Sequence, residues 1–202
     1  MDYWDNSPDL EQALNKICVS NNQEAATKID MDRILKDIPY QRWWRVFEVG
    51  CGVGRLILPM RHLFSTVEGV DYSAKMVELS KDYLRNRTNG QVWKNDGRTL
   101  PVSSNNYDFV FAFTVFQHIR SVEVLTSYLA EMYRVVRFGG WVRFQLHDTS
   151  NPAFGRFDED LSQVWGNAYT PDELRVIMET LNYKNIEIVE ESPWQWITAR
   201  KL

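Results

Sequence analysis

The chain has 202 residues, of which 44% are hydrophobic, and a formal net charge of -4. This length suits one domain with one sizeable core, and the acidic balance argues against a nucleic-acid partner. Two cysteines exclude a disulfide framework, and the longest apolar run, residues 109–116, is too short to span a bilayer. The acidic N-terminus does not resemble a signal peptide, so we expect a cytoplasmic protein with no membrane partner.

Two helices are predicted at the N-terminus, over residues 7–19 and 22–37. Ser7 is the expected N-cap of the first helix, and Pro8 stands where a first helical turn tolerates proline. We assign residues 1–40 to these helices and to a candidate lid. The apolar residues of the second helix that we expect to face a core are Ile29, Ile34, Leu35 and Ile38.

From residue 45 onward the hydrophobic pattern alternates between the strand and helix periods, which is typical of an α/β fold. The predicted strands cover residues 45–49, 66–70, 91–95, 107–115 and 141–147. The predicted helices between them cover about 54–64, 73–87 and 121–137. Gly139 and Gly140 are expected to end the last of these helices.

The C-terminal part begins with an irregular segment, residues 148–169, whose length is more often seen in a lid or substrate loop than in a plain linker. The sequence TPDE at 170–173 predicts a capping box and a helix. Two strands then follow, joined by a tight turn at 191–193. The expected fold is therefore a Rossmann-like, doubly wound, mostly parallel sheet of seven strands with a C-terminal antiparallel hairpin.

The first strand ends in a glycine-rich loop, and ligands of such sheets bind beyond the carboxyl ends of the strands. Gly50, Gly52 and Gly54 form a GxGxG pattern that lets the backbone approach a ligand closely. A dinucleotide fingerprint would be GxGxxG, but Arg55 stands where its third glycine would be. Cys51 is interpreted as a packing residue. The loop suits a nucleoside-containing ligand without predicting a pyrophosphate.

Two aspartates end the next two strands. Asp71 lies 21 residues after Gly50, where a carboxylate can accept hydrogen bonds from both ribose hydroxyls. The alternative is that Asp71 caps the helix that starts at Ser73. Asp96, followed by Gly97, can accept a hydrogen bond from an adenine amino group or can simply shape a turn.

Together these motifs resemble class I S-adenosylmethionine-dependent methyltransferases over roughly residues 44–147. The segments that carry the resemblance are VFEVGCGVGRL, VEGVDYSAKMVELSK, KNDGRTLPVSSNNYDFVFAFTVFQHI and EMYRVVRFGGWVRFQL. We treat residues 1–202 as a single methyltransferase domain. Its expected parts are the N-terminal helices (1–40), a cofactor-binding core (41–147), a lid or substrate loop (148–169) and a C-terminal helix and hairpin (170–202).

The resemblance implies S-adenosylmethionine as the cofactor and S-adenosylhomocysteine as the product. In it, the glycine loop lines the methionine portion, Asp71 holds the ribose and Asp96 takes the adenine amino group. The residues that it assigns to the cofactor are Glu48, Gly50, Cys51, Gly52, Gly54, Asp71, Tyr72, Asp96, Gly97 and Thr114. No metal site is predicted.

The methyl acceptor is sought near two histidines, since an imidazole of pKa about 6.5 can remove a proton from an acceptor. His118 follows the fourth strand and His147 ends the fifth, so both are candidate catalytic and substrate-binding residues. The alternatives are that His118 braces the next helix and that His147 is a solvated strand end. Tyr3, Trp4 and Trp165 offer aromatic surface for a substrate pocket.

The segment FTVFQH follows the fourth strand, where family members that methylate base amines carry an NPPY-like tetrapeptide. This difference favours a small-molecule acceptor over nucleic acid. Two alternatives are kept: a nicotinamide-dependent oxidoreductase on a related sheet, and a non-catalytic cofactor-binding or scaffold module, because a fold does not fix a function.

Overall fold

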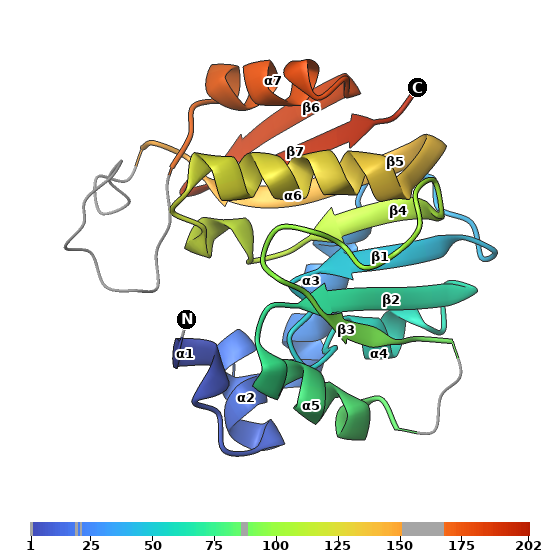
Figure 1. Ribbon diagram of the computed structural model, residues 1–202, viewed down its shortest axis with the longest axis vertical. Helices are drawn as coiled ribbons and strands as arrows, with labels where there is room; N and C mark the ends of the chain where they lie inside the picture. Colours follow the sequence, from blue (N-terminus) through green and yellow to red (C-terminus); the bar gives the residue numbers. More distant parts are fainter. Residues whose placement is uncertain (1, 19, 21, 86–88, 151–167) are drawn as a thin grey trace. The chain divides into compact units, whose positions relative to one another are not determined.

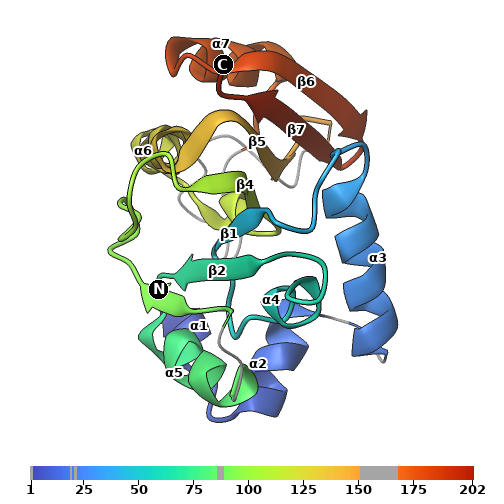
Figure 2. The same ribbon diagram turned by 90° about the vertical axis from the view of Figure 1, so that its right-hand side faces the viewer.

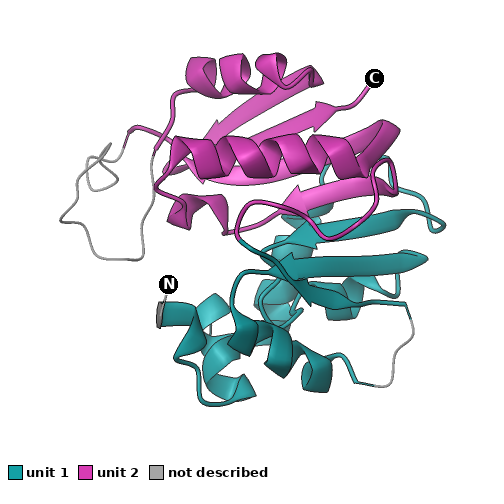
Figure 3. Cartoon of the chain, in the orientation of Figure 1, with its two compact units in different colours: residues 1–96 teal, residues 97–202 magenta. Residues whose placement is uncertain are grey.

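A computed structural model describes residues 2–18, 20, 22–85, 89–150 and 168–202. The predicted α/β fold class is confirmed: in these residues, seven strands form a mostly parallel sheet with a C-terminal antiparallel pair (Figure 1). The chain divides into two compact units, residues 1–96 and 97–202 (Figure 3). No helix in the described ranges is long and apolar enough to cross a membrane.

The first unit begins with three helices: α1 (Asp2–Asp5), α2 (Leu10–Ile17) and α3 (Gln23–Leu35). The helix predicted over residues 7–19 corresponds to α2, and α1 is an additional short helix before it. Its expected cap, Ser7, is wrong, because the carboxylate of Asp9 accepts the hydrogen bond from the Gln12 N–H at 2.9 Å. The inward position expected for Ile29 is also wrong, since 55% of this residue is exposed.

The strands and remaining helices of the first unit are β1 (Arg45–Val49), α4 (Ile57–Met60), β2 (Thr66–Asp71), α5 (Ala74–Tyr83) and β3 (Val92–Lys94). The strand order is β3-β2-β1, and both pairs are parallel (Figure 2). The helix predicted over 54–64 is reduced to the four residues of α4. Parallel strands bring their carboxyl ends to one edge, which carries the glycine loop after β1 and Asp71 at the end of β2.

The second unit contains β4 (Tyr107–Ala112), the 3₁₀ turn η1 (Phe116–His118), α6 (Val122–Val135), β5 (Val136–His147), α7 (Pro171–Thr180), β6 (Lys184–Glu191) and β7 (Trp194–Arg200). Its strand order is β4-β5-β7-β6. β4 is parallel to β5, and β7 is antiparallel to both of its neighbours, so the predicted hairpin is confirmed. All six residues of β4 are buried, as expected for a central strand.

Two details of the second unit test the predicted boundaries. The capping box is confirmed: the Thr170 hydroxyl accepts from the Glu173 N–H at 3.3 Å, and the Glu173 carboxylate accepts from the Thr170 N–H at 2.9 Å. The glycine pair does not end α6, because β5 begins directly after it at Val136. Gly139 instead lies inside the strand with a φ of 76°.

Candidate functional site

The glycine loop is folded back against the end of β2. The N–H groups of Gly50 and Cys51 both donate to the Val70 carbonyl, at 2.8 and 2.9 Å. Gly52 has a φ of 55°, where any other residue type would be strained. A Cβ at that position would also contact Ile17 of α2 at 3.5 Å. The loop is therefore a tight turn lying against α2, and its shape requires glycine.

Asp71 braces this loop from the neighbouring strand. One carboxylate oxygen accepts from the Gly52 N–H and the other from the Ser73 N–H, each at 2.8 Å. Burial raises the pKa of Asp71, and these two hydrogen bonds oppose that shift. The N-cap of α5 is Ser73, which accepts from the Met76 N–H at 3.1 Å, so Asp71 does not cap the helix. The Tyr72 N–H is a third backbone donor to this carboxylate. A carboxylate has about four acceptor positions, so Asp71 can still accept one ribose hydroxyl.

Glu48, in the middle of β1, is a buried carboxyl group beneath the loop. Only 3% of it is exposed, and its Oε2 atom has no hydrogen-bond partner among the described residues. Burial raises the pKa of Glu48 to about 8; Arg55 opposes this shift and Asp71 adds to it. At neutral pH the side chain is therefore protonated, and it offers a buried polar atom beside the loop.

Arg55, which breaks the dinucleotide pattern, connects the loop to α3. Its Nη1 atom donates to the Thr27 hydroxyl at 3.0 Å, and its Nη2 atom donates to the Asp30 carboxylate at 2.8 Å. The arginine side chain is 6% exposed, so this ion pair is largely desolvated. The arginine side chain reaches α3 from this position, which a glycine could not do.

The end of β3 lies beside Asp71, because the Asn95 N–H donates to the Asp71 carbonyl at 3.1 Å. Asp96, the next residue, is exposed at this edge. Tyr72 is 37% exposed, and the ammonium group of Lys94 lies 5.2 Å from the centre of its ring. The first unit therefore brings the predicted methionine, ribose and adenine positions to one edge of its three strands.

The N-terminal aromatic residues contact the same part of the first unit. Trp4 packs against the cluster formed by Ala13, Val53 of the glycine loop and Met76 of α5. Tyr3 is 40% exposed, and its carbonyl accepts from Lys16 Nζ at 2.7 Å. The sequence analysis missed Asp5, which accepts a 2.6 Å hydrogen bond from the Ser73 hydroxyl. Nothing in the local sequence marks a partner 68 residues away.

The second unit contains two residues that were predicted to contact the cofactor: Gly97, which follows β3, and Thr114, which follows β4. Gly97 has a φ of 84° and Thr114 a φ of 55°. A positive φ is a genuine outlier for a β-branched residue, and such outliers gather at functional sites. His118 follows in η1, and its Nε2 atom lies 3.3 Å from Nε2 of Gln117.

His147 is buried, not solvated as one alternative proposed. Its ring stacks on Trp194 with 3.9 Å between the ring centres, and its Nδ1 atom lies 3.3 Å from the Pro193 carbonyl oxygen. Burial lowers the pKa of His147; a nearby His118 also lowers it, whereas the Pro193 carbonyl and Asp148 act in the opposite direction. The two predicted histidines therefore lie close enough to interact within the second unit.

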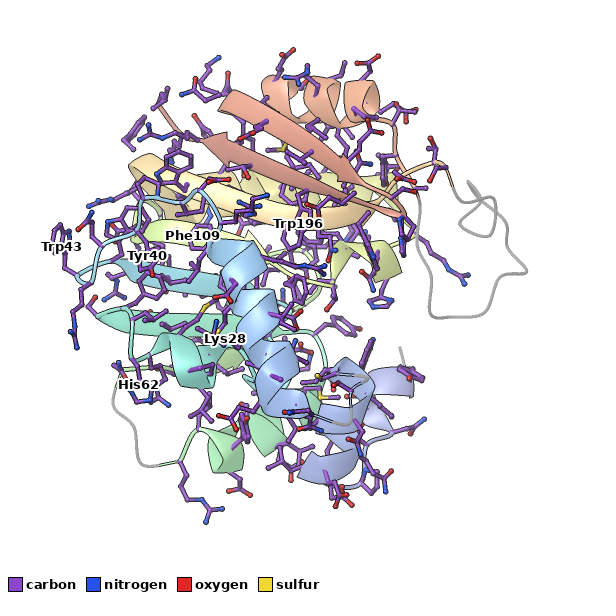
Figure 4. The ribbon with its side chains drawn as sticks, turned by 180° about the vertical axis from the view of Figure 1, so that it is seen from behind. Lys28, Tyr40, Trp43, His62, Phe109 and Trp196 are labelled. Atoms are coloured by element: carbon purple, nitrogen blue, oxygen red, sulfur yellow. The ribbon has the colours of Figure 1, made fainter. Side chains whose placement is uncertain are left out.

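Three further residues of the second unit were not predicted from the sequence: Gln145 of β5 and the stacked pair Phe113 and Trp196. Gln145 points to the same face of β5 as His147 because it lies two residues earlier, and only 3% of it is exposed. Its Oε1 atom has no hydrogen-bond partner among the described residues. Phe113 and Trp196 stack at 5.7 Å in the same unit; Figure 4 labels Trp196 on the sheet seen from behind. The predicted substrate residue Trp165 lies outside the described residues.

Comparison with known proteins identifies relatives of the chain. A family model described as a methyltransferase domain matches residues 47–144. The demethylmenaquinone methyltransferase of Staphylococcus aureus (strain MRSA252) is 27% identical over 135 residues, which cover 65% of this chain and 54% of that protein. The chain thus spans about half the length of the curated relatives it matches.

Solved structures share the fold. Phosphoethanolamine N-methyltransferase 2 of Haemonchus contortus, in complex with S-adenosyl-L-methionine, has a TM-score of 0.73 at 16% identity, over 88% of this chain and 52% of that one. A SAM-dependent methyltransferase of Aquifex aeolicus has a TM-score of 0.69 at 18% identity, over 94% and 97% of the two chains. With the family match, these findings favour neither the oxidoreductase nor the scaffold alternative. The chain therefore has the fold of S-adenosylmethionine-dependent methyltransferases, and its residues 47–144 match the methyltransferase-domain model.

Proposed function

We propose that the protein is an S-adenosylmethionine-dependent methyltransferase that methylates a small-molecule acceptor in the cytoplasm. The cofactor is assigned to the carboxyl edge of the first unit and the acceptor to the ends of β4 and β5 in the second. One observation carries the cofactor assignment: the 2.8 Å hydrogen bond from the Gly52 N–H to Asp71 joins the candidate ribose ligand to the glycine loop. The two cysteines are free and buried, which is compatible with a reducing compartment.

The residues of this edge fit the cofactor. The Oε2 atom of buried Glu48, which has no hydrogen-bond partner among the described residues, can bind a polar group of the methionine portion. The remaining acceptor position of Asp71 suits a ribose hydroxyl. When bound, the cofactor supplies a methyl group on a positively charged sulfur. The protein's main contribution is then alignment of acceptor and methyl group, an effect that can supply about 7–11 kcal/mol.

The side chains around the candidate acceptor region favour a planar molecule. Trp194, Phe113, Trp196 and the amide of Gln145 are uncharged, whereas the guanidinium group of Arg143 lies over the Trp196 ring, 5.0 Å from its centre. Aromatic walls with a few polar groups are the usual lining of a small-molecule site. An uncharged aromatic ring that bears a hydroxyl group can stack on these walls. The name of the S. aureus relatives suggests a reduced naphthoquinone as the first acceptor to test.

Replacing Asp71 tests the cofactor site. We expect Asp71→Ala to weaken S-adenosylhomocysteine binding roughly 10- to 100-fold, because charge-assisted hydrogen bonds contribute about 1.5–3 kcal/mol. Calorimetry measures the affinity, and thermal unfolding confirms that the variant folds. Asp5→Ala is the matched control: Asp5 also accepts from Ser73, and its second hydrogen bond comes from the Lys75 N–H of α5. A folded Asp71→Ala protein with unchanged affinity would show that the ribose assignment is wrong.

Turnover tests the activity itself. The wild-type enzyme is incubated with S-adenosylmethionine and 1,4-naphthohydroquinone, and the methylated product is detected by mass spectrometry. Phosphoethanolamine serves as the comparison acceptor. Faster methylation of phosphoethanolamine would contradict the preference for an uncharged ring.

A further inference from the structure

The imidazole ring of His147 is fixed at one of its nitrogens. Nδ1 lies 3.3 Å from the carbonyl oxygen of Pro193, in the turn between β6 and β7. A carbonyl oxygen can only accept a hydrogen bond, so Nδ1 must carry the hydrogen. In the neutral ring the lone pair is then on Nε2. The contact with Pro193 therefore selects one of the two tautomers.

The plane of the ring is fixed as well. It stacks on Trp194 with an angle of 21° between the rings and 3.9 Å between their centres. The His147 carbonyl accepts from the Tyr169 N–H at 3.3 Å and from Gln195 Nε2 at 3.2 Å. The Asp148 N–H donates to the same Pro193 carbonyl at 3.1 Å. Both the ring and the backbone of this residue are thus held by β7 and the turn that precedes it.

The charge state of the ring follows from its surroundings. Burial lowers the pKa of His147, and the neighbouring titratable groups are His118 of η1 and Asp148 after β5. His118 lowers this pKa further, while Asp148 and the Pro193 carbonyl raise it. The ring is therefore neutral at neutral pH. In the Nδ1–H form of the neutral ring, the basic nitrogen is Nε2, which is a buried atom.

We propose that His147 is the group that removes the acceptor's proton, with Nε2 as the basic atom and Pro193 and Trp194 as positioning residues. This proposal rests on the proposed function. The acceptor's hydroxyl gives its proton to Nε2, and the oxygen's freed electron pair bonds to the methyl carbon. The bond from that carbon to sulfur breaks, and its electron pair stays on sulfur as S-adenosylhomocysteine forms. The proton on His147 then passes to water.

Nitrogen NMR of the ¹⁵N-labelled protein tests the tautomer without any acceptor. The chain has three histidines, and the signals of His147 are those that vanish in His147→Asn. We expect a hydrogen on Nδ1, none on Nε2 at neutral pH, and a titration midpoint below the ordinary histidine value of 6.5. His62, which Figure 4 labels, is exposed and lies in the first unit. A hydrogen on Nε2, or a ring already charged at neutral pH, would overturn the proposal.

Kinetics separates a catalytic role from a purely structural one. In His147→Asn the side-chain amide can still donate to Pro193, but no basic nitrogen replaces Nε2. We expect unchanged S-adenosylhomocysteine affinity and a 10²- to 10⁴-fold lower kcat with 1,4-naphthohydroquinone, with loss of the acid limb of the pH–rate profile. His62→Asn is the matched control and should behave as the wild type.

The outcomes distinguish this proposal from the proposed function. If wild type and His147→Asn turn over at equal rates with the same pH profile, only the role of His147 is wrong. If the wild type binds S-adenosylhomocysteine but methylates no acceptor, the proposed function fails, and the role of His147 fails with it. Trp194→Phe, which keeps an aromatic ring under the imidazole, should retain more activity than Trp194→Ala.

Discussion

A single buried carboxyl group, Glu48, makes the stability of the protein depend on pH in an unusual direction. Its pKa is 4.5 in the unfolded chain and about 8 in the folded one, so the folded state holds a proton that the unfolded state loses. The stability that this proton provides is fully present below pH 4.5 and is lost as the pH rises towards 8.

We therefore expect the free energy of unfolding to fall by up to about 1.4 kcal/mol per pH unit between those values, from this group alone. Urea unfolding across the range measures the slope. Glu48→Gln, which is neutral at every pH, should flatten it, whereas Glu78→Gln should not, because the Glu78 side chain is 69% exposed. Equal slopes in wild type and Glu48→Gln would show that Glu48 is ionised in the folded protein.

Thr114 is a second residue of interest, because its backbone has a positive φ of 55°. The other described non-glycine residues with positive φ are Asp37, Asn105, Asn182 and Asn185. Asp and Asn tolerate this conformation because their short polar side chains bond locally, whereas a β-branched residue is strained. The strain lies between two anchored rings, Phe113 on Trp196 and Phe116 against Phe144 at 5.5 Å.

Thr114→Asn should accordingly stabilise the protein by about 1 kcal/mol, and Thr114→Val, which keeps the branch, should not. Thermal unfolding gives the comparison. We also expect lower turnover in Thr114→Asn, because a strained backbone at a functional site usually lowers stability but supports activity. A stabilised variant with full activity would mean that the positive φ of Thr114 has no role in catalysis and only connects Phe113 to Phe116.

At the scale of elements, the link between the glycine loop and α3 depends on one ion pair. Arg55→Met would leave Asp30, whose side chain is 18% exposed, without its cation. Removing one partner of a buried pair is expensive, and with this partial exposure we expect a loss of roughly 2–3 kcal/mol. The double variant Arg55→Met/Asp30→Asn should recover part of this loss, which a double-mutant cycle by urea unfolding measures. Strictly additive effects would indicate that the two side chains do not interact in solution.

Most helices and strands could be predicted from the local sequence, because the spacing of hydrophobic residues differs between the two. The six buried residues of β4 and the Thr170 capping box are examples in which neighbours in sequence carry the whole signal. The predicted ends of helices and strands were wrong where they depend on a contact with a residue far away in the sequence. Gly139 continues β5 because its N–H donates to the Lys201 carbonyl at 2.7 Å, a bond to the other end of the unit. Ser7 and Asp9 are both good capping residues, and the sequence did not distinguish them.

On the scale of the whole molecule, strand order explains what could be predicted of the candidate site. Parallel strands put Glu48, the glycine loop and Asp71 together, and this follows once the strands are recognised. The surroundings of His147 could not be foreseen, because they depend on the antiparallel register that places His147 opposite Trp194. A shift of one residue in that register would turn Trp194 to the other face of the sheet.

That register also determines the order in which parts of the protein can fold during its synthesis. Pro193, which orients the ring of His147, is joined to the chain 46 residues after it. At about 5–20 residues per second, translation leaves the histidine without this partner for roughly 2 to 9 seconds. The glycine loop and its Asp71 brace are complete much earlier. A growing chain can therefore form its cofactor edge first, and its imidazole is oriented only when the final hairpin has been made.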